Sequence, residues 1–208
     1  LIGLVGSEMC IRDSFIAVLL NSSLVTSGDN DLTKSITLDY ENRLKAIFED
    51  FHAHPELSLA EFETARKISA ALKNHGFKVT ENVGGTGVVA LLENGKGPLV
   101  MMRADMDGLP LEEKTDLPYA SKDKQLDPVT GNIFPVMHAC GHDVHITALI
   151  GTAKQMVDLK SEWSGTLMLI AQPAEERVLG ARNMMNDNLW ERFGKPDYAL
   201  AFLSLIHI

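Results

Sequence analysis

The sequence lacks the features that define several common protein classes. Only two cysteines, Cys10 and Cys140, occur in 208 residues, which excludes a small fold held together by several disulfides. No run of basic residues occurs and the formal net charge is −9, so a nucleic-acid surface, which needs clustered Lys and Arg, is excluded as well. No apolar run approaches the about 20 residues that span a bilayer. With 45% hydrophobic and 23% charged residues, the composition predicts a globular chain of one or two domains.

The two ends of the chain share an unusual symmetry. A DNA sequence that encodes residues 9–14 (MCIRDS) reads on its opposite strand as LSLIH, the sequence that begins at Leu203. This symmetry resembles the inverted transposon ends used to build sequencing libraries. We therefore expect residues 1–14 and 203–208 to be adapter-derived, which leaves Cys140 as the one native cysteine and allows no intrachain disulfide.

Residues 15–35 follow the first adapter segment. They begin with the apolar stretch FIAVLL and continue with small polar residues up to Gly28, as in a secretory signal whose charged start is missing. The alternative is a frayed N-terminal linker. The pattern favours a periplasmic or secreted protein, with the cytoplasm as the alternative location.

Hydrophobic periodicity predicts alternating helices and strands along the rest of the chain. Helices are expected over residues 39–51, 61–75 and 144–160, with another beginning at Gly180. Strands are expected over residues 78–81, 87–93, 98–105 and 165–172. The polar stretch 112–135 should be a surface loop that contains a hairpin. This order predicts an α/β fold, in which a mixed, largely parallel sheet carries helices on both faces.

Three polar clusters follow or interrupt the apolar runs, namely residues 103–107 (RADMD), 138–143 (HACGHD) and 173–176 (PAEE). In α/β sheets, ligands bind beyond the C-terminal ends of the strands. Cys140 and His142 are two residues apart, so a thiolate and an imidazole can converge on one cation, and carboxylates can complete the shell. This ligand set suits zinc, although carboxylate-rich surroundings also admit manganese, cobalt or nickel.

The adjacent pair Glu175-Glu176 is the most informative part of these clusters. Metal-dependent hydrolysis needs one carboxylate to hold the cation and another to move a proton from water to the leaving group. Neighbouring residues on a loop can point in different directions and divide these two roles. A single buried Cys or His is more often structural than functional, whereas Cys, His and a Glu pair together favour a site.

These motifs resemble those of the co-catalytic metallopeptidase and aminoacylase family, which includes hippurate hydrolases, N-acyl-amino-acid amidohydrolases and auxin-conjugate hydrolases. The resemblance covers nearly the whole native segment, in family order. The matching stretches are HAHPELSLAEFETA (52–65), GGTGVVALLENGKGP (84–98), MRADMDGLPLEE (102–113), MHACGHDVH (137–145) and QPAEERVLGARNM (172–184).

The resemblance implies two divalent metal ions and assigns a role to each residue of the site. Cys140, His142 and Glu176 would be ligands, and Glu175 would be the general acid and base. Asp107 would be grouped with Glu175 as a catalytic residue, because it would lie behind a ligand histidine and orient it. At position 105 this chain has an aspartate where other branches of the family carry a ligand histidine, and that difference, with cysteine at 140, points to the amidohydrolase branch.

The remaining histidines are expected to be structural. His138 would support its loop, His145 would lie in the core, and His52 and His54 would belong to the end of the first helix.

The resemblance also implies that residues 36–202 are part of a catalytic domain. The family places another ligand histidine where Leu203 stands, followed by an inserted dimerisation domain and a last ligand histidine. We therefore expect the parent protein to be a homodimer, and the 208-residue fragment alone not to assemble a complete dimetal site.

The function implied is metal-dependent hydrolysis of the amide bond of N-acyl or N-aroyl amino acids, such as hippurate, or of small peptides. The expected partner is this small-molecule substrate, with no nucleic acid and no membrane. Two alternatives stay open, namely a hydrolase with Cys140 as nucleophile and a histidine base, and a non-catalytic metal- or peptide-binding fragment. The sequence does not decide which acyl group is cleaved.

Overall fold

A computed structural model describes the backbone of residues 27–203 and the side chains of residues 31–203. The expected adapter segments lie outside these residues except for Leu203, as does the part of 15–35 before Ser27. The chain divides into two units after Glu41. In the first unit, the described residues form α2 (Ser27–Asp39) and the start of the π-helix η1 (Tyr40–Leu44). A helix therefore begins within the segment 15–35.

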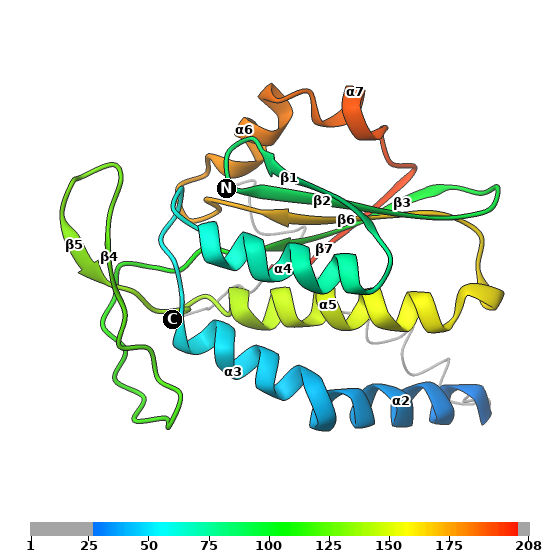
Figure 1. Ribbon diagram of the computed structural model, residues 1–208, viewed down its shortest axis with the longest axis horizontal. Coiled ribbons are helices and arrows are strands. Elements are labelled where there is room, and N and C mark those ends of the chain that lie inside the picture. The colour runs from blue at the N-terminus through cyan, green and yellow to red at the C-terminus, as the bar shows by residue number, and fades with distance from the viewer. Residues whose placement is uncertain (1–26, 204–208) are drawn as a thin grey trace, which may run out of the picture. The chain divides into compact units, whose positions relative to one another are not determined.

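The second unit contains a five-stranded sheet of order β1-β2-β6-β3-β7 (Figure 1). Its strands are β1 (Lys78–Val83), β2 (Gly87–Asn94), β3 (Leu99–Asp105), β6 (Gly165–Gln172) and β7 (Tyr198–Ala201). β2 is antiparallel to both β1 and β6, whereas β3 is parallel to both β6 and β7. All of these strands except β2 thus run in one direction, which confirms the predicted mixed, largely parallel sheet.

Helices cover both faces of this sheet, as predicted (Figure 1). One face carries α4 (Phe62–Asn74) and α5 (His142–Asp158), with α3 (Lys45–Ala53) packed against α5, and the other face carries α6 (Gly180–Asn186) and α7 (Leu189–Phe193). The 3₁₀ turn η2 (Lys160–Glu162) follows α5. In β6, Leu169 belongs to the core beneath α4 and α5, and its neighbour Met168 belongs to the core beneath α6. Because successive side chains enter opposite cores, the strand is apolar at almost every position.

The predicted elements agree with the observed ones to within a few residues. Helix α4 ends just before Gly76, whose φ of +84° gives the left-handed stop. The stretch 112–135 contains the predicted hairpin, made of β4 (Lys124–Leu126) and β5 (Ile133–Pro135). The sequence missed α2, α7 and β7. The last two are only five and four residues long, too short for periodicity to register.

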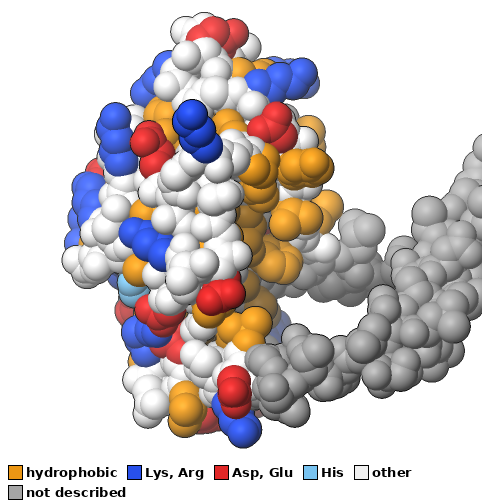
Figure 2. Space-filling view, turned by 90° about the vertical axis from the view of Figure 1, so that its right-hand side faces the viewer, with side chains coloured by type: hydrophobic (Ala, Val, Ile, Leu, Met, Phe, Trp, Pro, Cys, Tyr) orange, Lys and Arg blue, Asp and Glu red, His pale blue; other side chains and the backbone are white. Residues whose placement is uncertain are grey.

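Strand β7 forms one edge of the sheet, and all four of its residues are exposed. Tyr198 and Leu200 are among the large apolar side chains at the surface. Figure 2 shows hydrophobic side chains gathered on the right-hand side of the coloured part of the molecule. Charged side chains are spread over the rest of that view. Within the described part of the chain, no helix combines the length and apolar character needed to cross a membrane.

The sheet brings two of the polar clusters to one edge. Asp105, the last residue of β3, pairs with Gln172, the last residue of β6. Because the two strands are parallel neighbours, the loops that follow them leave the sheet side by side. Leu109 then forms a two-way backbone bridge with Met137, which brings the segment before α5 to the same edge.

Candidate metal centre

The candidate site is built from the loops after β3 and β6 and from the first turn of α5. Gly141 has a φ of +76°, a left-handed conformation that glycine adopts without steric cost. This turn makes His142 the first residue of α5. The imidazole is buried and points from the helix end towards the carboxyl ends of β3 and β6.

The orientation of the His142 ring is set by Asp107. Nδ1 donates a hydrogen bond to the Asp107 carbonyl oxygen at 2.7 Å, and an Asp107 carboxylate oxygen lies 3.3 Å from the same nitrogen. The proton of the neutral ring therefore sits on Nδ1, and the lone pair of Nε2 is free for a ligand. Burial would lower the pKa of His142, but the Asp107 hydrogen bond and the charges of Asp105 and Asp107 outweigh it and raise that pKa.

Nε2 of His142 faces the Glu175-Glu176 pair, as the sequence predicts. Glu175 Oε2 and Glu176 Oε1 each lie 3.8 Å from Nε2, and the ligand atoms of these three residues lie within 4.8 Å of one another. Ligand atoms about 2.0–2.2 Å from a shared divalent cation have mutual separations of this size. The three side chains therefore have the spacing of a metal-binding group.

Glu176 gives a second sign of an open coordination position. Its Oε1 atom is buried and has no hydrogen-bond partner among the described residues, although a buried carboxylate oxygen without a partner is costly. Burial, and then the negative charge of Glu176, raise the pKa of Glu175. A cation between these groups would compensate both the unpaired oxygen and the repulsion, so the residues present fit a divalent metal ion.

Cys140 is connected to this group by a hydrogen bond between its thiol and the Glu176 carboxylate. Burial, followed by the hydrogen bond that the thiol donates to Glu176 and by the charges of nearby carboxylates, raises the pKa of Cys140 to about 12. Among the described residues, the three-residue group around His142 does not include the Cys140 sulfur. The thiol therefore depends on a positive charge to become the thiolate that binds metal.

Asp107 lies beneath the site and holds it together. Its carboxylate accepts hydrogen bonds from the Ser58 hydroxyl at 2.6 Å and from the backbone amides of Glu175 and Glu176 at 3.1 Å each. Burial would raise the pKa of Asp107, but hydrogen bonds from His142, Ser58 and the Glu176 amide lower it. As a buried anion, Asp107 orients both the histidine and the acidic loop.

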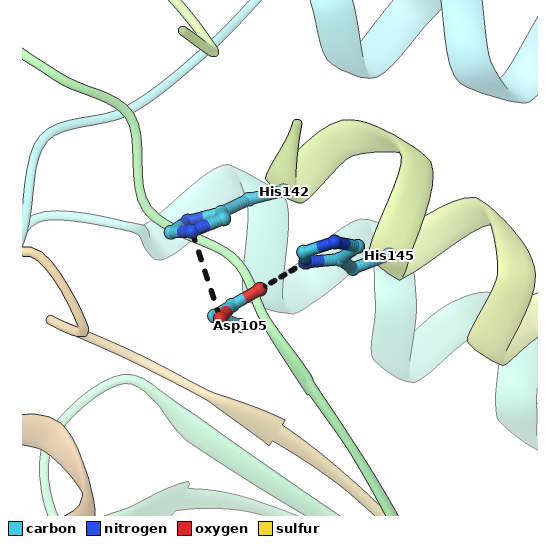
Figure 3. Close-up of side chains that lie close together, drawn as sticks. All are labelled: Asp105, His142 and His145. Atoms are coloured by element: carbon cyan, nitrogen blue, oxygen red, sulfur yellow. Dashed lines mark hydrogen bonds and ion pairs between the residues drawn. The ribbon is translucent and has the colours of Figure 1, made fainter. Parts of the chain in front are cut away.

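Figure 3 shows a second group that sequence reasoning missed, in which Asp105 lies between His142 and His145. Asp105 Oδ1 is 2.5 Å from His145 Nδ1, and Oδ2 is 3.6 Å from His142 Nε2. The available signal was the spacing of the two histidines, because residues three apart share a helix face. Arg103 also donates to Asp105 Oδ2 at 2.8 Å, so both carboxylate oxygens of Asp105 already have protein partners, whereas Glu176 Oε1 has none among the described residues.

Three further histidines, His52, His54 and His138, occupy different surroundings. His138 is buried, burial lowers its pKa to about 4, and neither ring nitrogen has a hydrogen-bond partner among the described residues. His52 is buried between Glu113 and Asp143. His54 is exposed at the end of α3.

Comparison with known proteins gives consistent matches. The chain is 40% identical over 166 residues to a hippurate hydrolase from Campylobacter jejuni, covering 79% of this chain and 40% of that protein. It is 34% identical over 197 residues to the IAA-amino acid hydrolase ILR1-like 5 from Arabidopsis thaliana, covering 90% of this chain and 43% of the relative. The chain thus spans about 40% of the length of the curated relatives it matches.

A solved structure and a family pattern agree with these relatives. The Bacillus subtilis YXEP protein, described as a dinuclear metal binding peptidase from the M20 family, superposes with a TM-score of 0.64 at 38% identity, covering 73% of this chain and 40% of that one. The pattern of Peptidase family M20/M25/M40 matches residues 101–206, which include both acidic loops and the start of α5. The chain therefore belongs to Peptidase family M20/M25/M40.

Proposed function

We propose that this chain carries metal-binding and proton-transfer residues of an amidohydrolase that cleaves N-acyl or N-aroyl amino acids or small peptides. The observation that carries the proposal is the convergence of His142 Nε2 with Glu175 and Glu176 at 3.8 Å, where one buried Glu176 oxygen lacks a partner among the described residues. Membership of the M20 family supports hydrolysis. The names of the relatives support conjugated amino acids as substrates.

Cys140, His142 and Glu176 are proposed to hold the cation. A thiolate, an imidazole and a carboxylate form a set that suits zinc and also accepts manganese, cobalt or nickel. The dinuclear relative supports two metal ions in the complete protein. A bound divalent ion would polarise the scissile carbonyl and make water more acidic.

Glu175 is proposed to be the general base and acid. Burial and the charge of Glu176 raise the pKa of Glu175, which brings that carboxylate closer to the range in which it can both accept and return a proton near neutral pH. Glu175 would take a proton from water and deliver it to the leaving amine. Asp107 would keep Glu175 in place through the backbone amide, without taking part in proton transfer.

The surroundings of Cys140 do not support the alternative in which it is the nucleophile. A nucleophilic cysteine needs a lowered pKa and a positively charged neighbourhood. Here burial and several carboxylates raise the pKa of Cys140 to about 12. Such a thiol is suited to metal ligation, in which the cation replaces the proton.

The test combines metal titration with hydrolysis. The chain is titrated with Zn²⁺ and Mn²⁺ by calorimetry, alongside Cys140→Ala, Glu176→Gln and Glu175→Gln. The first two variants should lose affinity, whereas Glu175→Gln should keep it. Hydrolysis of hippurate and N-acetyl amino acids is measured on this chain and on a longer protein that contains it, because the relatives are about twice as long as this chain. Stoichiometric metal binding without turnover in both proteins would favour a binding module instead.

A second comparison separates metal catalysis from thiol catalysis. Any hydrolysis should be abolished by a chelator and restored by adding metal. Resistance to the chelator together with inactivation by an alkylating reagent would reverse the assignment of Cys140.

A further inference from the structure

The loop that carries Glu175 and Glu176 is held by its backbone at three consecutive positions. The amide of Ala174 donates to Glu61 Oε1 at 2.7 Å, and the amides of Glu175 and Glu176 donate to the two oxygens of Asp107 at 3.1 Å each. Two buried carboxylates thus bind three successive N–H groups. Asp107 also touches His142, whereas Glu61 contacts neither of the acidic side chains in the described hydrogen bonds.

Glu61 stands immediately before α4 and is fully buried, with 0% of its surface exposed. Its second oxygen, Oε2, accepts a hydrogen bond from the Thr86 hydroxyl at 2.6 Å. Burial raises the pKa of Glu61, and the ion pairs of the described residues include none to this carboxylate. A polar group placed in such a costly position needs a reason, and its hydrogen-bond partners supply one.

The backbone held by Glu61 is strained. Ala174 has a φ of +46°, in the left-handed region that residues with a side chain rarely adopt. The turn is closed further along the chain, where the amides of Leu179 and Gly180 both donate to the Ala174 carbonyl at 3.2 Å. A side chain at position 180 would overlap the Pro173 carbonyl oxygen, since a Cβ there would lie 1.5 Å from it. Strained backbone persists only where its surroundings fix it.

We propose that Glu61 is a positioning residue for the metal centre. Its carboxylate holds the Ala174 amide in the strained turn and so sets the direction in which Glu175 and Glu176 leave the loop. The inference rests on the proposed function, in which the Glu175 and Glu176 carboxylates must both face one metal ion. Glu61 is far along the chain from the loop, so the HPELSLAE stretch acquires a role at the site without contributing a ligand.

The hydrogen bond, rather than the negative charge, is the essential part of this role. In Glu61→Gln the side-chain carbonyl can still accept from Ala174, while its NH₂ group faces Thr86, whose hydroxyl can accept as well as donate. Glu61→Ala removes the acceptor altogether. The conservative variant should therefore restore most of what the alanine variant loses.

Amide hydrogen exchange of the metal-free chain tests the positioning directly. Glu61→Ala should accelerate exchange in residues 174–178 by about tenfold or more, whereas Glu61→Gln should remain close to the unsubstituted protein. The matched control is Glu63→Ala in the first turn of α4, because the Glu63 side chain is exposed and pairs with Arg66. Unchanged exchange in residues 174–178, or an equal acceleration in all strands of the sheet, would overturn the proposal.

Metal affinity provides the second readout. Calorimetric titration with Zn²⁺ should show affinity reduced by about 10–100-fold in Glu61→Ala, the range seen when a residue that supports a ligand is lost, with recovery in Glu61→Gln. If the alanine variant does not fold, Thr86→Val removes the other partner of Glu61 and should give a smaller increase in exchange at residues 174–178. Failure of both the unsubstituted chain and the longer protein to bind metal would refute the proposed function, while the exchange data would still decide the role of Glu61.

Discussion

Two clusters of the molecule each place a buried histidine among glutamate and aspartate side chains. In the closed cluster both ring nitrogens lie at hydrogen-bonding distance from a carboxylate, whereas in the open cluster one ring nitrogen is 3.6 Å or more from the nearest carboxylates. In the closed cluster, His52 Nδ1 is 2.7 Å from Asp143 and Nε2 is 2.9 Å from Glu113, and the side chains are at most 10% exposed. In the open cluster, His142 Nε2 is 3.8 Å from both Glu175 and Glu176, whose side chains are 28% and 18% exposed.

The difference shows how the same residue types serve structure in one place and ligand binding in another. Both nitrogens of His52 lie at hydrogen-bonding distance from a carboxylate, and both can donate at once only when the ring is protonated. In the open cluster, Asp107 occupies one nitrogen of His142, and the other nitrogen faces carboxylates too far away to bond. A cation between these groups would compensate the repulsion of Glu175 and Glu176. The two clusters contain the same residue types, and the distances between their atoms distinguish the two roles.

The largest expected effect lies in the open cluster. Glu175→Gln should lower the rate of amide hydrolysis by about 10²–10⁴-fold, the usual contribution of a general base, because the amide cannot accept a proton from water. Steady-state kinetics with hippurate on the longer protein measures the rate. Calorimetric metal titration should show nearly unchanged affinity.

The matched substitution in the closed cluster is Glu113→Gln, which replaces the carboxylate next to His52 Nε2 by an amide. This variant should lose stability and retain hydrolysis per folded molecule. A Glu175→Gln protein with a near-normal rate would remove Glu175 from the mechanism and leave the open cluster as a binding site alone.

The next effect concerns the closed cluster. His52→Gln should destabilise the fold by about 3–5 kcal/mol, because it leaves Glu113 and Asp143 buried without the cation between them. Urea unfolding monitored by circular dichroism at pH 6 measures the change. A loss below about 1 kcal/mol would mean that water satisfies these carboxylates, and the cluster would then not be closed.

Whereas His52→Gln should destabilise the fold, Glu176→Gln in the open cluster should stabilise it. In the metal-free chain this variant removes a buried oxygen without a partner among the described residues and relieves its repulsion of Glu175, so the free energy of unfolding should rise by about 0.5–1 kcal/mol. Metal affinity should fall by more than about 100-fold, beyond the effect of losing a supporting residue. Urea unfolding without metal and Zn²⁺ titration provide the two measurements. Destabilisation without metal would contradict an open cluster.

The sequence predicted the open cluster better than the closed one. Glu175 and Glu176 follow the apolar strand β6, whose carboxyl end lies beside that of its parallel neighbour β3. Cys140 and His142 reach the same edge through the bridge between Leu109 and Met137, which the apolar pattern did not predict. The closed cluster joins positions 61 and 91 residues apart, from His52 to Glu113 and Asp143. No periodicity encodes that pairing, so the motif HAHPELS indicated only the end of a helix.

The sheet and its covering helices were predictable for a similar reason. Burial on both faces made β6 continuously apolar, and the strand lies at the predicted residues 165–172. In contrast, Asp105 stands where other branches of the family carry a ligand histidine, and the sequence did not predict its partners. In the structure Asp105 pairs with Arg103 and His145. Residue identity alone does not reveal whether a carboxylate has already been neutralised by its neighbours.

The pH dependence of stability sharpens the distinction for His52. Burial alone would lower the pKa of His52, but the hydrogen bonds and charges of Glu113 and Asp143 raise it above the ordinary 6.5. The imidazolium therefore stabilises the fold fully below pH 6.5, and this contribution is lost as pH rises through the folded pKa. Besides burial, the charge of His52 helps to lower the pKa of the nearby His138, while Phe48 and Tyr119 contact the His52 ring.

The measurement compares unfolding free energies of the unsubstituted chain and His52→Gln from pH 5.5 to pH 9. Their difference should shrink with rising pH, at no more than about 1.4 kcal/mol per pH unit for one proton. A difference that grows with pH would show that His52 is neutral in the folded chain.

The smallest effect is expected two residues further along, at His54. This side chain is 57% exposed and lies 3.3 Å from Asp50, itself half exposed, in the same turn of α3. Solvent screens such a pair, so His54→Gln should change stability by less than about 0.5 kcal/mol, with no pH trend beyond that of the unsubstituted chain. Urea unfolding of this variant beside His52→Gln compares two histidines from one helix end that differ mainly in burial. If His54→Gln destabilised the fold as much as His52→Gln, the loss at position 52 would come from a change at the end of α3. The buried ion pairs of His52 would then not be the source of its contribution to stability.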